Sequence, residues 1–301
     1  MTVHRLTELL ERCGPLTGKE IREHIPADIF DLWRYCNTCP NLIHKTVGSR
    51  YLRLDRNVEG FARLSPSILR EFCNYTAVGL SDRPEALDAR VRQIHQEIIR
   101  ISGKKQELAR GIISGIVDSQ QDSGLIRENA CFLIAGDVAY QMAHLEPRPE
   151  SSTGEFVNGS DLDIVVVVRG LPDTIVERLD TAIYDRKYFL MRNPGHREEI
   201  DYVIKDLAKV RAQLDFLDFK SVVASKVLEE GLFLYGNHDL FREIKDLIKE
   251  KGIPLKLAAL SEIAAQKREN ARLELLTFSD SVLDENLRHL LFTTEEQEEF
   301  Y

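Results

Sequence analysis

The sequence has few cysteines and no apolar run long enough to cross a bilayer. Five cysteines are a modest and odd number for 301 residues, which favours a reducing compartment over a disulfide framework. The missing apolar run argues against a membrane-spanning helix. His4, Arg5 and Glu8 interrupt the first apolar residues, so we expect no signal peptide and a cytoplasmic protein without membrane attachment.

Basic residues are outnumbered, with 40 Lys and Arg against 49 Asp and Glu. The net charge is −9, and it is unevenly spread: residues 1–80 carry 11 basic and 9 acidic residues, a net +2, whereas the remainder carries −11. The acidic remainder argues against a broad, non-specific groove for nucleic acid, although it leaves room for a local basic patch. The length and a hydrophobic content of 43% fit one large globular domain or two smaller ones.

Two carboxylates lie two residues apart at the start of a β-branched run, in the stretch Asn158–Val168. Side chains alternate between the faces of a strand, so Asp161 and Asp163 point to the same side. Paired carboxylates repel unless a cation lies between them, and Mg²⁺ suits such a place because it prefers oxygen ligands and bridges to phosphates. Gly159 and Ser160 supply a tight turn and a hydroxyl where a phosphate would lie. An isolated D-x-D is also common in a solvated loop that precedes a strand.

Two further segments favour the metal interpretation. The apolar run 132–136 ends in Gly136 and is followed by the helical spacing of Val138, Met142 and Leu145, which predicts a strand turning into a helix whose N-terminus can hold an anion. Downstream, residues 188–191 are predicted to form a strand and 193–195 a turn. Residues 199–204 then alternate as a strand that completes a hairpin and has Asp201 inside it. A third acid on a neighbouring strand would complete a site for two metal ions.

This order of motifs resembles the DNA polymerase β-type nucleotidyltransferase superfamily over residues 125–250. Residues 227–236 are similar to the segment that follows the core in the minimal nucleotidyltransferases of bacterial toxin–antitoxin and defence systems. The resemblance implies transfer of a nucleoside monophosphate from an NTP, such as ATP, to a hydroxyl acceptor. It implies two Mg²⁺ ions held by Asp161, Asp163 and Asp201. It also places five residues near the nucleotide phosphates: Gly136, Gly159, Ser160, Lys220 and Ser221.

The chain departs from the family pattern in two places. Asp137 stands where the family usually has Gly or Ser, and an acid fits poorly beside a triphosphate. The gap between Gly136 and Asp161 is long and contains a surface loop at 146–154. The acceptor is left open between an RNA end such as that of tRNA, a protein side chain and a small molecule. The alternative to an enzyme is a DNA-binding regulator or adaptor with a non-catalytic core.

The amino-terminal 80 residues predict three short helices, a hairpin formed by 42–46 and 50–54, and another helix from Ser65 onward. This pattern resembles a winged helix, which often binds DNA through a helix in a groove. The alternative is a module that binds a protein or positions RNA, and toxin–antitoxin systems imply a cognate protein partner. The candidate phosphate contacts are Arg34, Lys45, Arg50, Arg53 and Arg56.

The predicted fold class is α+β: a nucleotidyltransferase core of mixed sheet and flanking helices, with an N-terminal winged helix and a helical C-terminal part. The predicted boundaries are 1–80 for the winged helix, 81–124 for a helical connector broken at Ser102-Gly103, 125–250 for the core, and 251–301 for C-terminal helices with an acidic tail. A lone C-x-x-C at Cys36 and Cys39 permits zinc, but a core thiol and a helix-end thiol explain it better.

Overall fold

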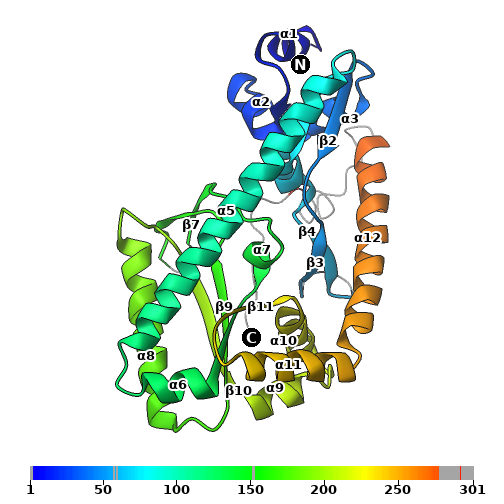
Figure 1. The fold of residues 1–301 in the computed structure, drawn as a ribbon. Coiled ribbons are helices and arrows are strands. Elements are labelled where there is room, and N and C mark those ends of the chain that lie inside the picture. Colours follow the sequence, from blue (N-terminus) through cyan, green and yellow to red (C-terminus); the bar gives the residue numbers. More distant parts are fainter. Residues whose placement is uncertain (1–2, 57, 59, 151–152, 278–291, 293–301) are drawn as a thin grey trace. The chain divides into compact units, whose positions relative to one another are not determined.

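The computed structural model describes residues 3–56, 58, 60–150, 153–277 and 292 (Figure 1). They form a mixed α+β fold that divides into two compact units: the described residues up to 97 together with those from 259 onward, and the described residues from 98 to 258. The division falls inside two long helices, α5 (Pro84–Asp118) and α12 (Ile253–Thr277). In the described part of the chain, no helix has the length and apolarity needed to span a membrane.

The first unit packs helices against a small antiparallel sheet with the strand order β1-β5-β2. Its core includes Leu6, Ile21, Trp33 and Val78, all buried. A separate hairpin pairs β3 with β4. The elements are α1 (Val3–Cys13), β1 (Leu16–Thr17), α2 (Gly18–His24), α3 (Ile29–Thr38), β2 (Leu42–Thr46), β3 (Tyr51–Leu54), β4 (Ala62–Ser65), α4 (Ile68–Arg70), the π-helical turn η1 (Glu71–Tyr75) and β5 (Thr76–Leu80).

The predicted hairpin between 42–46 and 50–54 is wrong. β2 pairs instead with β5, placing Leu42 opposite Leu80, and β3 turns back into β4. The helix predicted from Ser65 onward begins instead at Ile68, with Ser67 as its N-cap, because Ser65 ends β4. At the start of α2, Thr17 Oγ1 accepts from Glu20 N–H at 3.3 Å while Glu20 Oε2 accepts from Thr17 N–H at 2.7 Å. This reciprocal capping box starts α2. Cys36 is a core residue and Cys39 caps the end of α3, as expected.

The second unit is built on a four-stranded sheet with the order β10-β9-β6-β11. The edge strand β10 runs parallel to β9, and the other neighbours are antiparallel. The elements are α6 (Ser123–Asn129), β6 (Ala130–Ile134), α7 (Gly136–Ala139), the hairpin β7 (Pro147–Pro149) and β8 (Phe156–Asn158), β9 (Leu162–Val168), α8 (Asp173–Arg192), β10 (Ile200–Asp206), α9 (Leu207–Gln213), α10 (Phe219–Glu230), β11 (Leu232–Gly236) and α11 (His238–Glu250).

Every residue of β9 is buried, which suits the β-branched run that fills the strand from Ile164 to Val168. One face of the strand, with Ile164 and Val166, shares a core with apolar residues of α5 and α8. On the far side of the sheet, α9 contacts β9 and β10 while α11 contacts β6. The carboxylate pair at the start of β9 therefore stands on a strand fixed from both faces.

Three predictions for this region are wrong. α5 runs unbroken through Ser102 and Gly103, and the buried Ser102 Oγ accepts from Ala143 N–H at 3.1 Å. Residues 188–191 belong to α8 and not to a strand, so β10 does not form a hairpin with them. The predicted helix through Met142 and Leu145 ends at Ala139. The predicted acidic tail at 293–301 lies outside the described residues.

Candidate metal centre

Asp161, Asp163 and Asp201 meet where β9 and β10 begin. The two strands pair in parallel with Asp163 directly opposite Asp201, and Asp161 immediately precedes β9. One carboxylate oxygen from each residue lies within 4.8 Å of the others. Asp163 is buried, whereas Asp161 and Asp201 are half-buried and so remain accessible from solvent. The prediction that a third acid lies on the neighbouring strand is confirmed.

The turn between β6 and α7 lies against this cluster. Gly136 has a φ of +62°, and a β-carbon at this position would overlap Oδ2 of Asp163. The preceding Ala135 N–H donates to the Asp163 carbonyl at 2.9 Å. Only glycine satisfies both the left-handed backbone and the close approach. Gly136 therefore shapes the space around the Asp163 carboxylate.

The start of α7 is not the anion site that the sequence predicted. This helix has only four residues, and Gly136 N–H already donates to Glu230 Oε1 at 3.1 Å. Glu230 also pairs with Lys226 at 2.6 Å, and the Lys226 ammonium lies 5.5 Å from the centre of the Tyr140 ring. An internal carboxylate from α10 thus takes the position that a phosphate would need at this turn.

Ser160 and Gly159 are engaged within the protein. Ser160 Oγ donates to Asp137 Oδ2 at 2.6 Å and accepts from His144 N–H at 3.2 Å, and both Ser160 and Asp137 are buried. Gly159 has a φ of +69° and packs against the His144 carbonyl, where a β-carbon would overlap. Asp137, the departure from the family pattern, is therefore buried and accepts the serine hydroxyl.

Lys220 and Ser221 lie at the start of α10. Ser221 completes a capping box with Asp218, whose side chain accepts from Ser221 N–H at 2.7 Å, and Lys220 is exposed beside it. Glu230 is nine residues further along, about 13 Å at 1.5 Å per residue. The α10 residues that reach the Gly136 turn are consequently Lys226 and Glu230, and the structure does not bring Lys220 or Ser221 to the carboxylates.

Two cations contact the carboxylates directly. Arg148, on β7, forms ion pairs with Asp161 and with Glu199, the latter at 2.8 Å, and it donates to the Gly159 carbonyl at 3.1 Å. Lys187, on α8, donates to Asp201 Oδ1 at 2.7 Å. These side chains offset the repulsion among the acids. Sequence reasoning missed them because they come from a hairpin and a helix outside the motif.

Glu199 is a fourth carboxylate beside the three aspartates. It precedes β10, and its carbonyl accepts from Leu162 N–H at 2.9 Å, which continues the parallel pairing of the two strands. Burial raises the pKa of Glu199, while Arg148 opposes that rise and Asp201 adds to it. Glu199 and Asp201 repeat the two-residue spacing of Asp161 and Asp163. This spacing is the sequence signal that predicts Glu199 beside the other carboxylates.

The donor set fits a hard divalent cation. Carboxylate oxygens are the preferred ligands of Mg²⁺, and three of them converge here from a rigid pair of strands. Asp161, Asp163 and Asp201 are the residues that would hold it. Among the described residues, they form the only group of three or more His, Cys, Asp or Glu side chains with this proximity, and no such group includes Cys36 or Cys39.

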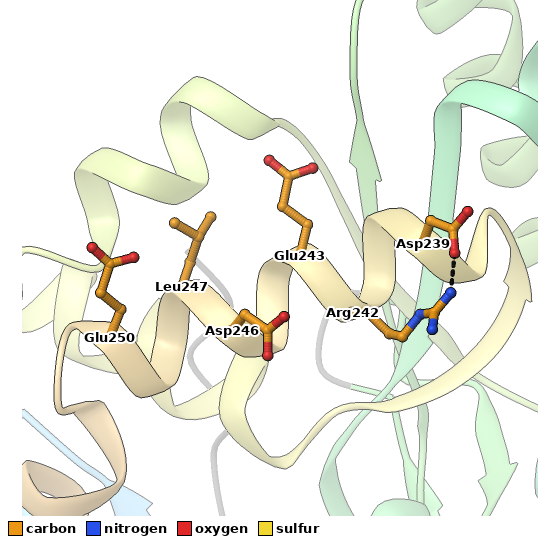
Figure 2. Close-up of a pocket in the computed structure, with 6 residues that line it drawn as sticks. All are labelled: Asp239, Arg242, Glu243, Asp246, Leu247 and Glu250. Atoms are coloured by element: carbon orange, nitrogen blue, oxygen red, sulfur yellow. Dashed lines mark hydrogen bonds and ion pairs between the residues drawn. The ribbon is translucent and has the colours of Figure 1, made fainter.

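A surface hollow lies elsewhere, on α11. It has a volume of about 470 Å³ and is lined by six residues of α11 alone (Figure 2). Figure 2 shows Arg242 directed at Asp239, with which it forms an ion pair, while Glu243 is also paired with Arg169 and Arg211. The hollow contains none of the three aspartates and offers no catalytic grouping.

In comparisons with protein-family models, with curated proteins and with solved structures, nothing matches this chain. The geometry of the carboxylates is therefore the main guide to what the protein does.

Proposed function

We propose that this protein is a magnesium-dependent nucleotidyltransferase that moves a nucleoside monophosphate from an NTP to a hydroxyl acceptor. The observation that carries the proposal is the convergence of Asp161, Asp163 and Asp201 within 4.8 Å on two adjacent parallel strands. The close fit of Gly136 against Asp163 supports it, because strand, glycine turn and carboxylate pair adjoin as they do in the family that the sequence resembles.

In the proposed reaction, the acceptor hydroxyl gives its proton to solvent and its oxygen forms a bond to the α-phosphorus. The bond from the α-phosphorus to the oxygen that bridges to the β-phosphate breaks, and pyrophosphate leaves with that oxygen. Mg²⁺ bound by the three aspartates would neutralise phosphate charge and lower the pKa of the acceptor hydroxyl. Asp161 and Asp163 face the nucleotide, and Asp201 faces the acceptor. Arg148 and Lys187 hold the carboxylates in place before substrate arrives.

The first unit gives this core a recognition module. Its order of helices and strands, with the antiparallel sheet β1-β5-β2 behind α2 and α3, supports the assignment as a winged helix in which the β3–β4 hairpin is inserted before the last strand. Two of its predicted phosphate contacts are used internally, because Arg53 is buried and Arg50 pairs with Glu71 at 2.5 Å. These contacts favour a protein partner over DNA for this unit.

The second candidate function is a regulator or adaptor with a non-catalytic core. It is favoured by the ion pairs of Arg148 and Lys187, which already supply positive charge to Asp161 and Asp201. It is also favoured by Glu230, whose carboxylate holds the Gly136 turn. In this case the carboxylates would be a structural network without turnover.

Incubation with each α-³²P-labelled NTP, Mg²⁺ and cell lysate or total RNA separates the two candidates. We expect label in RNA or in protein, and its loss in Asp163→Asn. The matched control is Asp185→Asn, because Asp185 is an exposed acid on α8 outside the carboxylate cluster. Equal labelling by the wild type and Asp163→Asn would show that the transfer does not depend on the carboxylate centre. No label from any NTP, with no Mg²⁺ binding by calorimetry, would favour the non-catalytic core.

A further inference from the structure

On α8, two tyrosine rings and one arginine lie on one face of the helix, with Tyr184 and Arg192 exposed and Tyr188 half-buried. Tyr184, Tyr188 and Arg192 recur every four residues and so lie on the same helix face. We call these three residues the tyrosine ladder. The two tyrosine rings are 5.2 Å apart between centroids, and the Arg192 guanidinium lies 5.0 Å from the centre of the Tyr188 ring. The Tyr184 side chain is 51% exposed.

The ladder stands on a fixed support. Tyr202, on the edge strand β10, donates its hydroxyl to Asp180 Oδ1 at 2.9 Å, and Asp180 is one turn before Tyr184 on α8. On its opposite side, α8 buries Ile175, Leu179 and Ile183 in the core of the second unit. The helix that carries the rings is therefore held in place before a ligand binds, and each ring is restrained by its contact with its neighbour, which lowers the entropic cost of binding.

The ladder leads to the acceptor side of the proposed reaction centre. Lys187 lies between Tyr184 and Tyr188 in the sequence, and its ammonium donates to Asp201 at 2.7 Å. Asp201 is the carboxylate that faces the acceptor in the proposed mechanism. A chain stacked on the two rings would thus have one end beside Asp201.

The charge of this segment is opposite to that of the protein. Residues 184–197 contain four basic residues and one acid, a net +3, within a chain of net charge −9. Among the residues that the structure describes, no carboxylate forms an ion pair with Arg186, Arg192 or Arg197, whereas Arg178 on the same helix pairs with Asp122. Arg186 instead lies 5.8 Å from the centre of the exposed Phe189 ring.

From this arrangement we infer that the acceptor is the end of a single-stranded polynucleotide, which α8 holds by stacking bases on Tyr184 and Tyr188 and by pairing phosphates with Arg192. Aromatic rings interleaved with cations are the common platform for single strands, because every base has a face to stack and every linkage has a negative charge. A protein side chain or a small acceptor would not need two rings followed on the same helix face by an arginine that no described carboxylate neutralises. The inference rests on the proposed function for the identity of the bound end as acceptor, but not for the binding itself.

The test measures binding without turnover. Fluorescence anisotropy with labelled 12-nucleotide RNA and DNA single strands, and with the matched duplexes, is recorded on the full-length protein in EDTA without NTP. We expect single strands to bind more tightly than duplexes, and the RNA and DNA arms to show which sugar is preferred. Tyr184→Ala and Tyr188→Ala should each weaken single-strand binding about 5-fold or more. Tyr184→Phe and Tyr188→Phe should bind as the wild type does, because they keep the ring.

The arginines are tested by salt dependence. Arg192→Ala should reduce the slope of log affinity against log salt by about 0.7, the value for one phosphate contact on a single strand, and Arg178→Ala should leave it unchanged. Equal binding by wild type and Tyr184→Ala/Tyr188→Ala, or a loss shared equally by the alanine and phenylalanine variants, would overturn the inference. If the ladder binds single strands but no label is transferred, the proposed function fails alone. If label is transferred to protein while no single strand binds, the inference fails alone.

Discussion

Gly136 and Asp163 approach so closely that no side chain fits between them. We predict that Gly136→Ala displaces the Asp163 carboxylate, because the new β-carbon would overlap its Oδ2 atom. Mg²⁺ affinity should fall by at least about tenfold, equivalent to about 1.4 kcal/mol. Isothermal titration calorimetry with Mg²⁺ on the wild type and the variant gives this number.

Gly170→Ala is the matched control, because it imposes the same backbone strain as Gly136→Ala without the overlap of the new β-carbon with another atom. Gly170 has a φ of +68°, close to the +62° of Gly136, but a β-carbon there meets no atom within 4 Å. Both variants should lose about 1–2 kcal/mol of unfolding free energy from the left-handed backbone, measured by denaturant titration. Only Gly136→Ala should also lose Mg²⁺ affinity, and an equal loss in both variants would mean that the contact with Asp163 does not matter.

The three aspartates should contribute unequally. Asp201→Asn should keep much of the Mg²⁺-dependent NTP binding, because Asp161 and Asp163 remain, yet it should slow transfer by several orders of magnitude. The reason is that this carboxylate faces the acceptor, whose hydroxyl needs a lowered pKa to attack. Calorimetric NTP titration and the labelled-transfer assay on the same variant provide both measurements. Parallel loss of binding and transfer would instead make Asp201 part of the nucleotide site.

The carboxylate centre could be predicted from sequence because its signal is local. The two-residue spacing of Asp161 and Asp163 before a β-branched run fixes one strand face, and Asp201 sits in a second strand with the same alternation. Parallel pairing then brings the two strand starts together. Element boundaries with local caps, such as the capping box of Thr17 and Glu20, were predictable for the same reason.

The partners of these residues could not be predicted, because they depend on long-range packing. Arg148 and Lys187 come from a hairpin and a helix, and nothing in their neighbours indicates that they reach acids elsewhere. The pairing of β2 with β5 was missed because an inserted hairpin separates two strands whose apolar patterns also suit nearer partners. From the sequence alone, Asp137 is an acid beside a predicted phosphate-binding turn. Its hydrogen bond from the Ser160 hydroxyl depends on a contact between residues 23 positions apart, which the sequence does not indicate.

Arg148 should stabilise the protein most at neutral pH. Burial already raises the pKa of Glu199 and Arg148 opposes that rise, so Arg148→Met should raise this pKa further. When the pKa of an acid is higher in the folded state than in the unfolded state, the protein loses stability as the pH rises from the unfolded-state pKa through the folded-state pKa. The variant should therefore be less stable than wild type by about 1–3 kcal/mol at pH 7.5, with the difference shrinking toward pH 5.

Denaturant titration at several pH values checks this prediction. The matched control is Arg178→Met, since Arg178 forms its ion pair with Asp122 on the same unit but both side chains are more than a third exposed. Its cost should stay within about 1 kcal/mol at all pH values, as is usual for surface pairs. If the difference in unfolding free energy between Arg148→Met and the wild type does not change with pH, Arg148 stabilises the protein through its packing and not through its charge beside Glu199.

A buried ion pair lies beside the segments that lead into β9 and β10, the strands that begin at the carboxylates. Lys105, which is buried on α5, donates to Glu198 at 2.6 Å and to the Asn158 carbonyl at 2.9 Å. Burial lowers the pKa of Lys105 and raises that of Glu198, so each charge depends on the other. Lys105→Met should cost about 3–5 kcal/mol of unfolding free energy, because it leaves the Glu198 carboxylate buried without its cation.

The neighbouring residue and a double variant test that explanation. Lys104→Met, one residue away on the exposed side of α5, should change stability by no more than about 0.5 kcal/mol. Lys105→Met/Glu198→Leu should recover most of the loss, because no buried charge remains, and should still lack about 1 kcal/mol for the bond to Asn158. Since Asn158 begins the turn into Asp161, Lys105→Met should also weaken Mg²⁺ binding and the double variant should not restore it fully. If the double variant is as unstable as Lys105→Met, the loss comes from packing around the lysine stem and not from the stranded carboxylate.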